Sequence, residues 1–408
     1  MPDALPDALP GGVIQFLPTV ERIVYGRGTL DAMAAEVERF GAARVMILTA
    51  RALERGALID RIAAILGTRH AATFAAPFEH VPLESAVAAA AAARRCGAGL
   101  IVAVGGGSVI DAAKALRICI AAGIDRPGAL AAFIDAPFHL INGIIPQLSI
   151  PTTLSGAEYT RSFSATDFAR GRKRSYTSSA AASRAIIYDP EATLATPPGL
   201  WLSSGVMALD HAIEVFCAAS PHPVGDVLKI SAARALLTYL PQTYDAPADL
   251  DARAGAQVAA WMADHSPLRA LALALAPAPA ALPSHAIAYE LGALCRVPYG
   301  LAACVTLPAF LRVGAARDSA HARRQAELAR SLGLGAKGSS DADSAGHLAD
   351  ELDTLIARLA LPARLRDLGV GRGDLARIAQ AFAARGASIT GAAPATAPEV
   401  VALLESAW

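Results

Sequence analysis

A run of three glycines between an apolar segment and a helical pattern constrains the fold of this chain more than any other feature. Leu100–Val104 (LIVAV) is followed directly by Gly105–Ser108 (GGGS), and a helical pattern then covers residues 109–121. Glycine lets backbone N–H groups approach a phosphate closely, and a helix N-terminus adds partial positive charge. The order of strand, turn and helix predicts an α/β fold with a phosphate-binding turn, although tight packing alone also explains such glycines.

The rest of the first half alternates strand-like and helical patterns. Strand-like runs cover residues 44–49, 100–104 and 148–151, and helical patterns cover residues 58–66, 85–96 and 109–121. The strand-like runs show no alternation of polar and apolar residues, which is typical of a parallel sheet covered on both faces.

The second half has a different sequence pattern, because strand-like runs disappear after about Pro197. Helical patterns rich in Ala and Leu cover residues 203–218, 225–240, 252–264, 285–294, 318–332 and 349–360. We therefore predict three parts: a flexible tail over residues 1–12, an α/β domain over 13–195 and an all-helical domain over 196–408. The glycine-rich segment 335–346 is interpreted as a surface loop.

The composition limits the partners of the chain. Lys and Arg together number 36, as do Asp and Glu, so the chain has no net charge to attract nucleic acid or an anionic membrane. No uninterrupted apolar stretch reaches the roughly 18 to 20 residues that span a bilayer. The five cysteines form no CxxC pair, and the first residues lack the charge pattern of a signal peptide. We expect a cytoplasmic protein with a small-molecule substrate.

Four segments together resemble one enzyme family. Residues 105–115 (GGGSVIDAAKA) are similar to the GGGS-x-x-D-x-A-K signature of the iron-dependent (group III) alcohol dehydrogenases, a family that includes maleylacetate reductases. Residues 23–30 (IVYGRGTL), 150–158 (IPTTLSGAE) and 187–190 (IYDP) resemble further segments of that family in the same order. The resemblance covers roughly residues 13–310. It implies a Rossmann-like, dehydroquinate synthase-like α/β domain that binds NAD or NADP, followed by an all-helical domain.

The resemblance also implies a cofactor site. It assigns the dinucleotide to Gly105, Gly106, Gly107, Ser108, Asp111, Lys114, Thr152 and Thr153. NAD-selective members often end the strand that corresponds to residues 44–49 with an Asp that repels a 2′-phosphate. Here Ala50 and Arg51 stand at that point. This exchange favours tolerance of NADP, but a surface arginine explains Arg51 equally well.

The metal positions of the family are only half retained. Metal-using members bind iron or zinc through an Asp and three His, and the matching residues here are Met207, His211, His285 and Tyr299. A thioether and a neutral phenol are poor ligands for such ions. Asp210 cannot replace the missing carboxylate, because adjacent residues lie about 100° apart around a helix. We predict no catalytic metal; any residual metal would bind at His211 and His285.

Without a metal, other groups must polarise a carbonyl and handle the proton. The resemblance brings His211, His285, Tyr289 and Tyr299 together as candidates for this role, since imidazole and phenol can donate to a carbonyl oxygen. Taken alone, a Tyr or His in an apolar helix is more often a hydrogen-bonded core residue, and that alternative applies to each of them. Arg161 is the candidate for binding a substrate carboxylate or phosphate, with a solvated loop as the alternative.

These observations predict an NAD(P)-dependent oxidoreductase of the maleylacetate reductase-like branch, with a small carbonyl or alcohol substrate bound in an interdomain cleft. The Ser204-Gly205-x-x-Ala208-x-x-His211 segment is closer to that branch than to the metal-using members. A homodimer is expected. Two alternatives stay open at this point: a dehydroquinate synthase-like enzyme, and a nucleotide-binding homologue without dehydrogenase activity.

Overall fold

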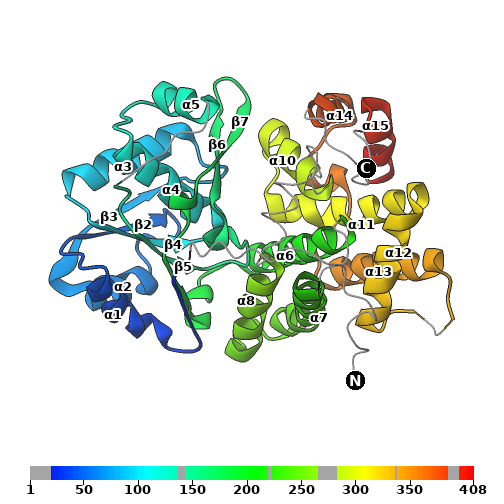
Figure 1. Cartoon of the computed structure of the whole chain (residues 1–408), viewed down its shortest axis with the longest axis horizontal. Helices are drawn as coiled ribbons and strands as arrows, with labels where there is room; N and C mark the ends of the chain where they lie inside the picture. Colours follow the sequence, from blue (N-terminus) through cyan, green and yellow to red (C-terminus); the bar gives the residue numbers. More distant parts are fainter. Residues whose placement is uncertain (1–19, 137–142, 219–222, 265–282, 336–337, 385–394) are drawn as a thin grey trace. The chain divides into compact units, whose positions relative to one another are not determined.

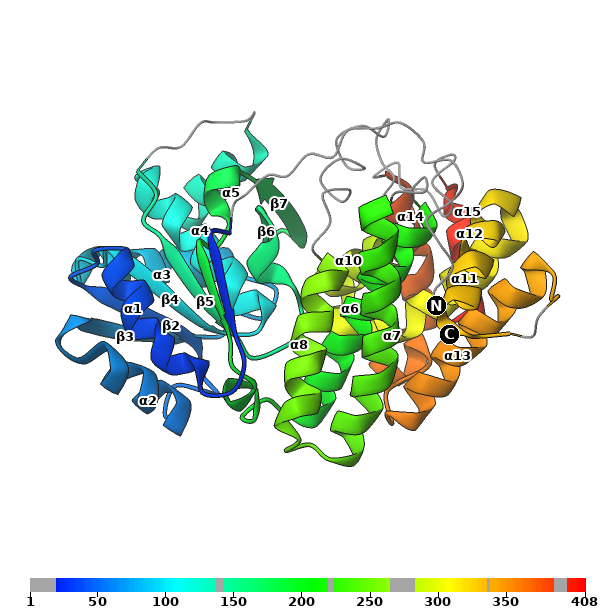
Figure 2. The same ribbon diagram turned by 60° about the horizontal axis from the view of Figure 1, so that its bottom comes forward.

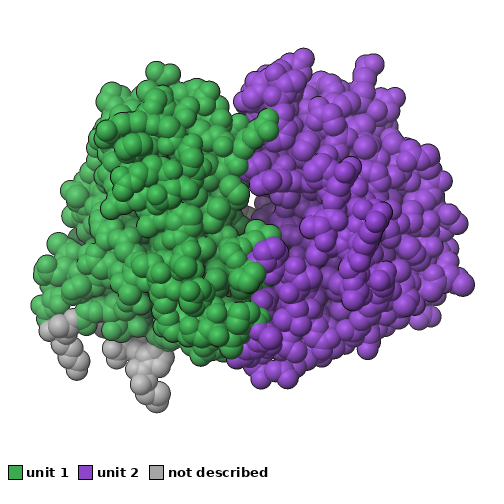
Figure 3. Space-filling view, turned by 180° about the vertical axis from the view of Figure 1, so that it is seen from behind, with its two compact units in different colours: residues 1–17, 198–247, 258–408 green, residues 18–197, 248–257 purple. Residues whose placement is uncertain are grey.

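The computed structural model describes residues 20–136, 143–218, 223–264, 283–335, 338–384 and 395–408 (Figure 1). Within these ranges the chain forms two compact units, an α/β unit over residues 18–197 and 248–257 and a helical unit over 198–247 and 258–408 (Figure 3). Residues 248–257 include the first turns of helix α8 (Leu250–Asp264) and cluster with the α/β unit. The tail predicted at residues 1–12 lies outside the described residues.

The α/β unit is built on one parallel sheet of six strands. Their order across the sheet is β1 (Arg22–Tyr25), β8 (Ala185–Tyr188), β5 (Gln147–Pro151), β4 (Leu100–Gly105), β2 (Val45–Ala50) and β3 (His70–Ala76). Every residue of β4, β5 and β8 is buried. The predicted parallel sheet with two covered faces is therefore confirmed.

Side chains alternate along the central strands between two layers of helices. In β2, Val45 and Ile47 pack into one core with helices α1 (Met33–Arg39) and α2 (Ala57–Leu66), while Met46 and Leu48 pack into the opposite core. That second core contains helices α3 (Leu83–Arg95), α4 (Gly107–Ala121) and α5 (Pro127–Asp135). Figures 1 and 2 show α1 and α2 on one side of the sheet and α3, α4 and α5 on the other.

A separate two-stranded hairpin stands beside helix α4. It consists of β6 (Ser162–Asp167) and β7 (Arg172–Thr177), which pair in antiparallel fashion. The basic residues 172–174 are thus part of a strand. The sequence hides it because Arg172 and Arg174 face outward from a strand whose apolar content is small.

The helical unit contains helices and turns in every part that the structure describes. Its long helices are α6 (Pro198–Ala218), α7 (Pro223–Asp245), the second part of α8, α10 (Pro283–Cys295), α11 (Tyr299–Arg317), α12 (Ser319–Leu332), α13 (Asp341–Arg358), α14 (Leu375–Ala384) and α15 (Ala397–Ser406). The loop predicted at 335–346 is wrong from Asp341 onward. Ser340 caps α13 by accepting a hydrogen bond from Asp343 N at 3.1 Å, and two acidic residues in the first turn stabilise this helix start.

Helices α6 and α11 form the centre of the helical unit. They pack against each other, and α7, α10, α12 and α13 surround them. By length and composition alone both could cross a membrane, but 94% of the apolar window of α6 and 61% of that of α11 are buried inside the fold. Their apolar sequence is accounted for by their place in this core.

Candidate active site

The glycine turn joins β4 to the N-terminus of α4. Gly105 has φ +155°, and a Cβ there would stand 2.7 Å from the side chain of Val109. Gly106 occupies the N-cap position, and no side chain in the described part of the chain caps this helix. The first N–H groups of a helix have no partner within it, so this N-terminus is suited to bind an anion.

The segment that follows β5 packs directly on the glycine turn. A Cβ at Gly106 would lie 3.1 Å from Thr153 Cγ2, and a Cβ at Gly107 would lie 2.7 Å from Ser155 Oγ. Thr152 N donates to Gly105 O at 3.0 Å. The structure thus places Thr152 and Thr153 next to the glycines. The glycines allow this close packing and also leave the N-terminus of α4 accessible.

Asp111 and Lys114, predicted near the cofactor, lie about one and about two turns into α4, respectively. Lys114 is completely buried, and its ammonium donates to Asp111 Oδ1 at 2.9 Å, Thr160 Oγ1 at 2.8 Å and two carbonyls, Ala157 O at 2.6 Å and Ser162 O at 2.8 Å. A buried charge needs such partners. In this structure the ammonium fastens the segment after Thr153 to helix α4.

The remaining predicted residues of the α/β unit lie at strand ends. Ala50 is the last residue of β2, and Arg51 begins the following turn with an exposed side chain. Neighbouring parallel strands β2, β4 and β5 end at the same edge of the sheet, so Ala50 and the glycine turn share that edge. Arg161 precedes β6, is half-buried, and its carbonyl accepts from Ser178 N at 3.0 Å.

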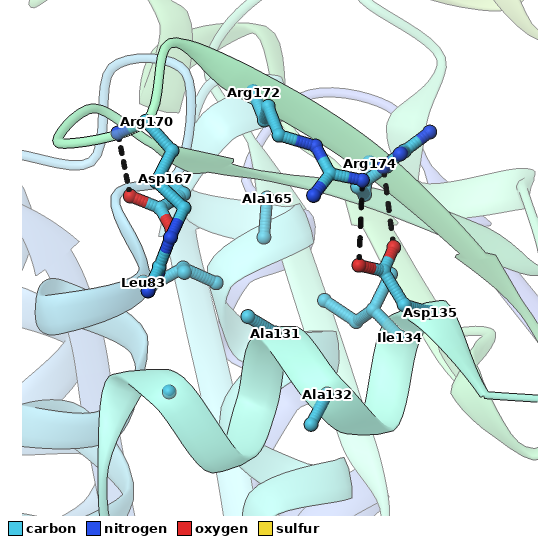
Figure 4. A pocket seen from close by; sticks show the side chains of 11 residues that line it. Leu83, Ala131, Ala132, Ile134, Asp135, Ala165, Asp167, Arg170, Arg172 and Arg174 are labelled. Atoms are coloured by element: carbon cyan, nitrogen blue, oxygen red, sulfur yellow. Dashed lines mark hydrogen bonds and ion pairs between the residues drawn. The ribbon is translucent and has the colours of Figure 1, made fainter.

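The basic cluster after Asp167 lines a pocket of about 220 Å³ between α5 and the hairpin. Arg170 pairs with Asp167 at 2.7 Å, while Arg172 and Arg174 face Asp135 at 3.6 and 3.2 Å (Figure 4). Each of these three guanidinium groups therefore has a carboxylate of the same unit beside it. The two pairs with Asp135 are exposed and hold the hairpin against α5 only weakly.

The helical unit brings together all four residues that the sequence proposed for carbonyl chemistry. His211 lies on α6, His285 and Tyr289 lie on α10, and Tyr299 begins α11. Ring centroids are 5.1 Å apart for His211 and His285, 5.4 Å for His285 and Tyr299, and 6.4 Å for the two tyrosines. His211 Nε2 lies 3.3 Å from His285 Nδ1. The four rings form one contiguous cluster.

Two local features fix the helices that carry these rings. The buried carboxylate of Glu214 on α6 accepts from the backbone N–H of Ser284 at 2.6 Å and of His285 at 3.2 Å, which caps the start of α10. Gly300 crosses α6 so closely that a Cβ there would lie 2.6 Å from Ser203 O. This crossing brings the neighbouring Tyr299 to the histidines.

Asp264, the last residue of α8, was missed by the sequence analysis. Its two carboxylate oxygens each lie 3.3 Å from His211 Nδ1, and both side chains are buried. The two residues are 53 positions apart in the chain. The only sequence signal is a carboxylate at the end of an alanine-rich helical pattern.

Iron or zinc does not fit the residues present at this cluster. In the described part of the chain, no three His, Cys, Asp or Glu side chains are placed to hold a metal ion. Asp264 contacts Nδ1 of His211, whereas His285 faces Nε2 on the other side of the ring, so these groups cannot share one ion. Met207 and Tyr299 would have to complete the set, and both are poor ligands for such ions.

Comparisons with known proteins agree with this architecture. A family model described as "Iron-containing alcohol dehydrogenase" matches residues 20–190, and one described as "Fe-containing alcohol dehydrogenase family, C-terminal" matches residues 201–408. The chain is thus an oxidoreductase. It belongs to the iron-containing alcohol dehydrogenase family, in its maleylacetate reductase-like branch, as the sequence motifs predicted.

Individual relatives support the same placement. Maleylacetate reductase of Burkholderia cepacia is 32% identical over 319 residues, which cover 78% of this chain and 80% of the relative. The solved maleylacetate reductase of Rhizobium sp. strain MTP-10005 has a TM-score of 0.72 at 26% identity, covering 98% of this chain and 99% of that chain. Sulfoacetaldehyde reductase of Bifidobacterium kashiwanohense, solved in complex with NAD+, has a similar fold, with a TM-score of 0.79 at 22% identity and coverage of 97% and 99%.

Proposed function

We propose that this protein is an NAD(P)-dependent oxidoreductase that transfers a hydride between the nicotinamide and a small carbonyl or alcohol substrate, without a catalytic metal. The observation that carries the proposal is the cluster of His211, His285, Tyr289 and Tyr299, in which three of the four rings, those of His211, His285 and Tyr299, stand at the family's metal positions. The uncapped helix end at Gly106 supports the cofactor assignment. A relative that binds NAD+ with the same fold is consistent with it.

In this proposal each unit performs one task. The N–H groups at the start of α4 bind the pyrophosphate, and the threonines after β5 line the cofactor. The bound nicotinamide supplies the hydride. Imidazole and phenol donors then stabilise the negative charge that develops on the carbonyl oxygen, and one such donor contributes about 2.7 to 4 kcal/mol.

The maleylacetate reductase relatives favour a carbonyl substrate that carries a carboxylate. We assign recognition of that carboxylate to Arg161, because a guanidinium binds a carboxylate through two parallel hydrogen bonds. The substitution of Ala50 and Arg51 for an acidic residue supports the use of NADPH beside NADH.

The function is tested by assaying the purified protein with NADH and NADPH against small keto acids, including maleylacetate, and aldehydes, and with NAD+ and NADP+ against alcohols. We expect cofactor oxidation with at least one keto acid. A His285→Ala preparation controls for host dehydrogenases, which would give the same rate in both samples. Tight cofactor binding with no turnover on the whole panel would instead favour the nucleotide-binding homologue.

Metal analysis tests the second part of the proposal. The purified protein should contain far less than one equivalent of iron or zinc, and chelators should leave its activity unchanged. A Met207→Asp/Tyr299→His variant restores the family's ligand types and should bind zinc more tightly than the natural chain. Stoichiometric metal in the natural protein, lost on chelation together with activity, would show that it uses a metal.

A further inference from the structure

Three buried or half-buried polar side chains lie in a row across helices α8, α6 and α10. The carboxylate of Asp264 lies 3.3 Å from Nδ1 of His211, and Nε2 of His211 lies 3.3 Å from Nδ1 of His285. Only 4% of the His211 side chain and 1% of the Asp264 side chain are exposed. Water therefore competes little for these contacts.

The chemistry of the three groups fixes the direction of their hydrogen bonds. An ionised carboxylate only accepts, so the proton of a neutral His211 ring must lie on Nδ1. Its Nε2 is then an acceptor, and the neighbouring Nδ1 of His285 must be the donor. The second ring is left with an unprotonated Nε2 on its far side. One carboxylate thus determines the tautomer of two imidazoles in sequence.

We propose that Asp264 is a positioning residue, which holds His211 and His285 with a proton on Nδ1 and so makes Nε2 of His285 the ring nitrogen that exchanges a proton with the substrate oxygen, taking it from an alcohol and returning it to a carbonyl. Its catalytic consequence rests on the proposed function, whereas the tautomer order does not. Asp264 touches neither cofactor nor substrate in this scheme and acts only through His211. The four positions of the family's metal pattern do not include it.

A purely structural alternative is that Asp264 anchors the end of α8 to α6. Kinetics of Asp264→Asn separate the two roles, because the amide keeps the size of the side chain and loses the charge. We expect kcat to fall about ten- to a hundredfold, since the loss cannot exceed that from removing His211 itself. The KM for the cofactor should stay within a few-fold. Asp251→Asn, an exposed carboxylate on the same helix, is the matched control and should change neither value.

A double-variant comparison sharpens the test. In a His211→Ala background, Asp264→Asn should cause no further loss of kcat, because the group through which it acts is gone. An equal loss with and without His211 would mean that Asp264 stabilises the fold by another route, and the proposal would be wrong.

A spectroscopic readout keeps the proposal testable without any substrate. In ¹⁵N-histidine spectra of the cofactor-free protein, His211 and His285 should both show a protonated Nδ1 and an unprotonated Nε2, and Asp264→Asn should shift His211 toward the other tautomer. Unchanged spectra in that variant would overturn the proposal. If no substrate is ever turned over, the proposed function fails, and these spectra still decide the role of Asp264.

Discussion

Replacing either histidine of the cluster by alanine is expected to lower the rate of hydride transfer about a hundredfold or more, and to leave cofactor affinity within a few-fold. In the proposed metal-free mechanism, the charge on the developing alkoxide must be met by hydrogen-bond donors. His285 is one of these donors when its Nε2 carries the proton, and His211, whose Nε2 lies 3.3 Å from Nδ1 of His285, holds that ring in place. Removing one should therefore disable the pair, whereas the glycine turn belongs to the other unit and stays intact.

Single-turnover stopped-flow measurements with deuterated cofactor isolate this step from binding and product release. Tyr299→Phe, which keeps the ring and removes only the hydroxyl, should cost less unless that hydroxyl is the proton donor. His347→Ala, at an exposed position of α13, is the control for loss of an unrelated imidazole. If both cluster variants transfer hydride at the natural rate, the donors lie elsewhere, and Arg161 becomes the next candidate.

Replacing Gly106 by valine is expected to abolish dinucleotide binding, as measured by fluorescence titration with NADH and NADPH. A side chain at this N-cap would occupy the space in which the pyrophosphate meets the backbone. The same side chain would also press on the chain itself, because its Cβ would lie 3.1 Å from Thr153 Cγ2. Loss of binding in this variant alone therefore has two explanations.

A double-mutant cycle separates them. Thr153→Ala removes the methyl and hydroxyl that crowd Gly106, so a Gly106→Ala/Thr153→Ala variant has room for the new methyl group. If Gly106 serves the phosphate, this variant should bind cofactor much more weakly than Thr153→Ala alone. Equal affinity of these two variants would mean that the glycine serves packing only. Circular dichroism should first show that each variant is folded.

Sequence patterns were sufficient for the elements that bury long apolar runs. Strands β2, β4 and β5 and most of the long helices lie within a few residues of their predicted bounds. Strand β3 (HAATFAA) was missed because alanine does not favour a strand, and β1 because it has only four residues. The hairpin was missed because its strands are polar and its stability comes from packing on α4 and α5.

The residues of the candidate site were also only partly predictable from the sequence. His211, His285, Tyr289 and Tyr299 were found because a family pattern fixes their positions. Asp264 was not, because its contact with α6 depends on how two helices pack. Lys114 was predicted only in part. Its proximity to Asp111 follows from helical spacing, but the other acceptors around its ammonium group belong to residues 157–162. No local sequence pattern predicts these hydrogen-bond acceptors.

The tight crossing of Gly300 over Ser203 has a consequence for how this enzyme could be changed. The crossing fixes the backbone at the start of α11 whatever side chain the preceding position carries. Under the proposed metal-free mechanism, exchanges at positions 207 and 299 would then separate metal-assisted from metal-free catalysis by only two substitutions on the same backbone. A small library that varies only these two positions would contain the variants that lie between the two sets of side chains. Selection on zinc-supplemented and zinc-depleted media would show which of these variants remain active.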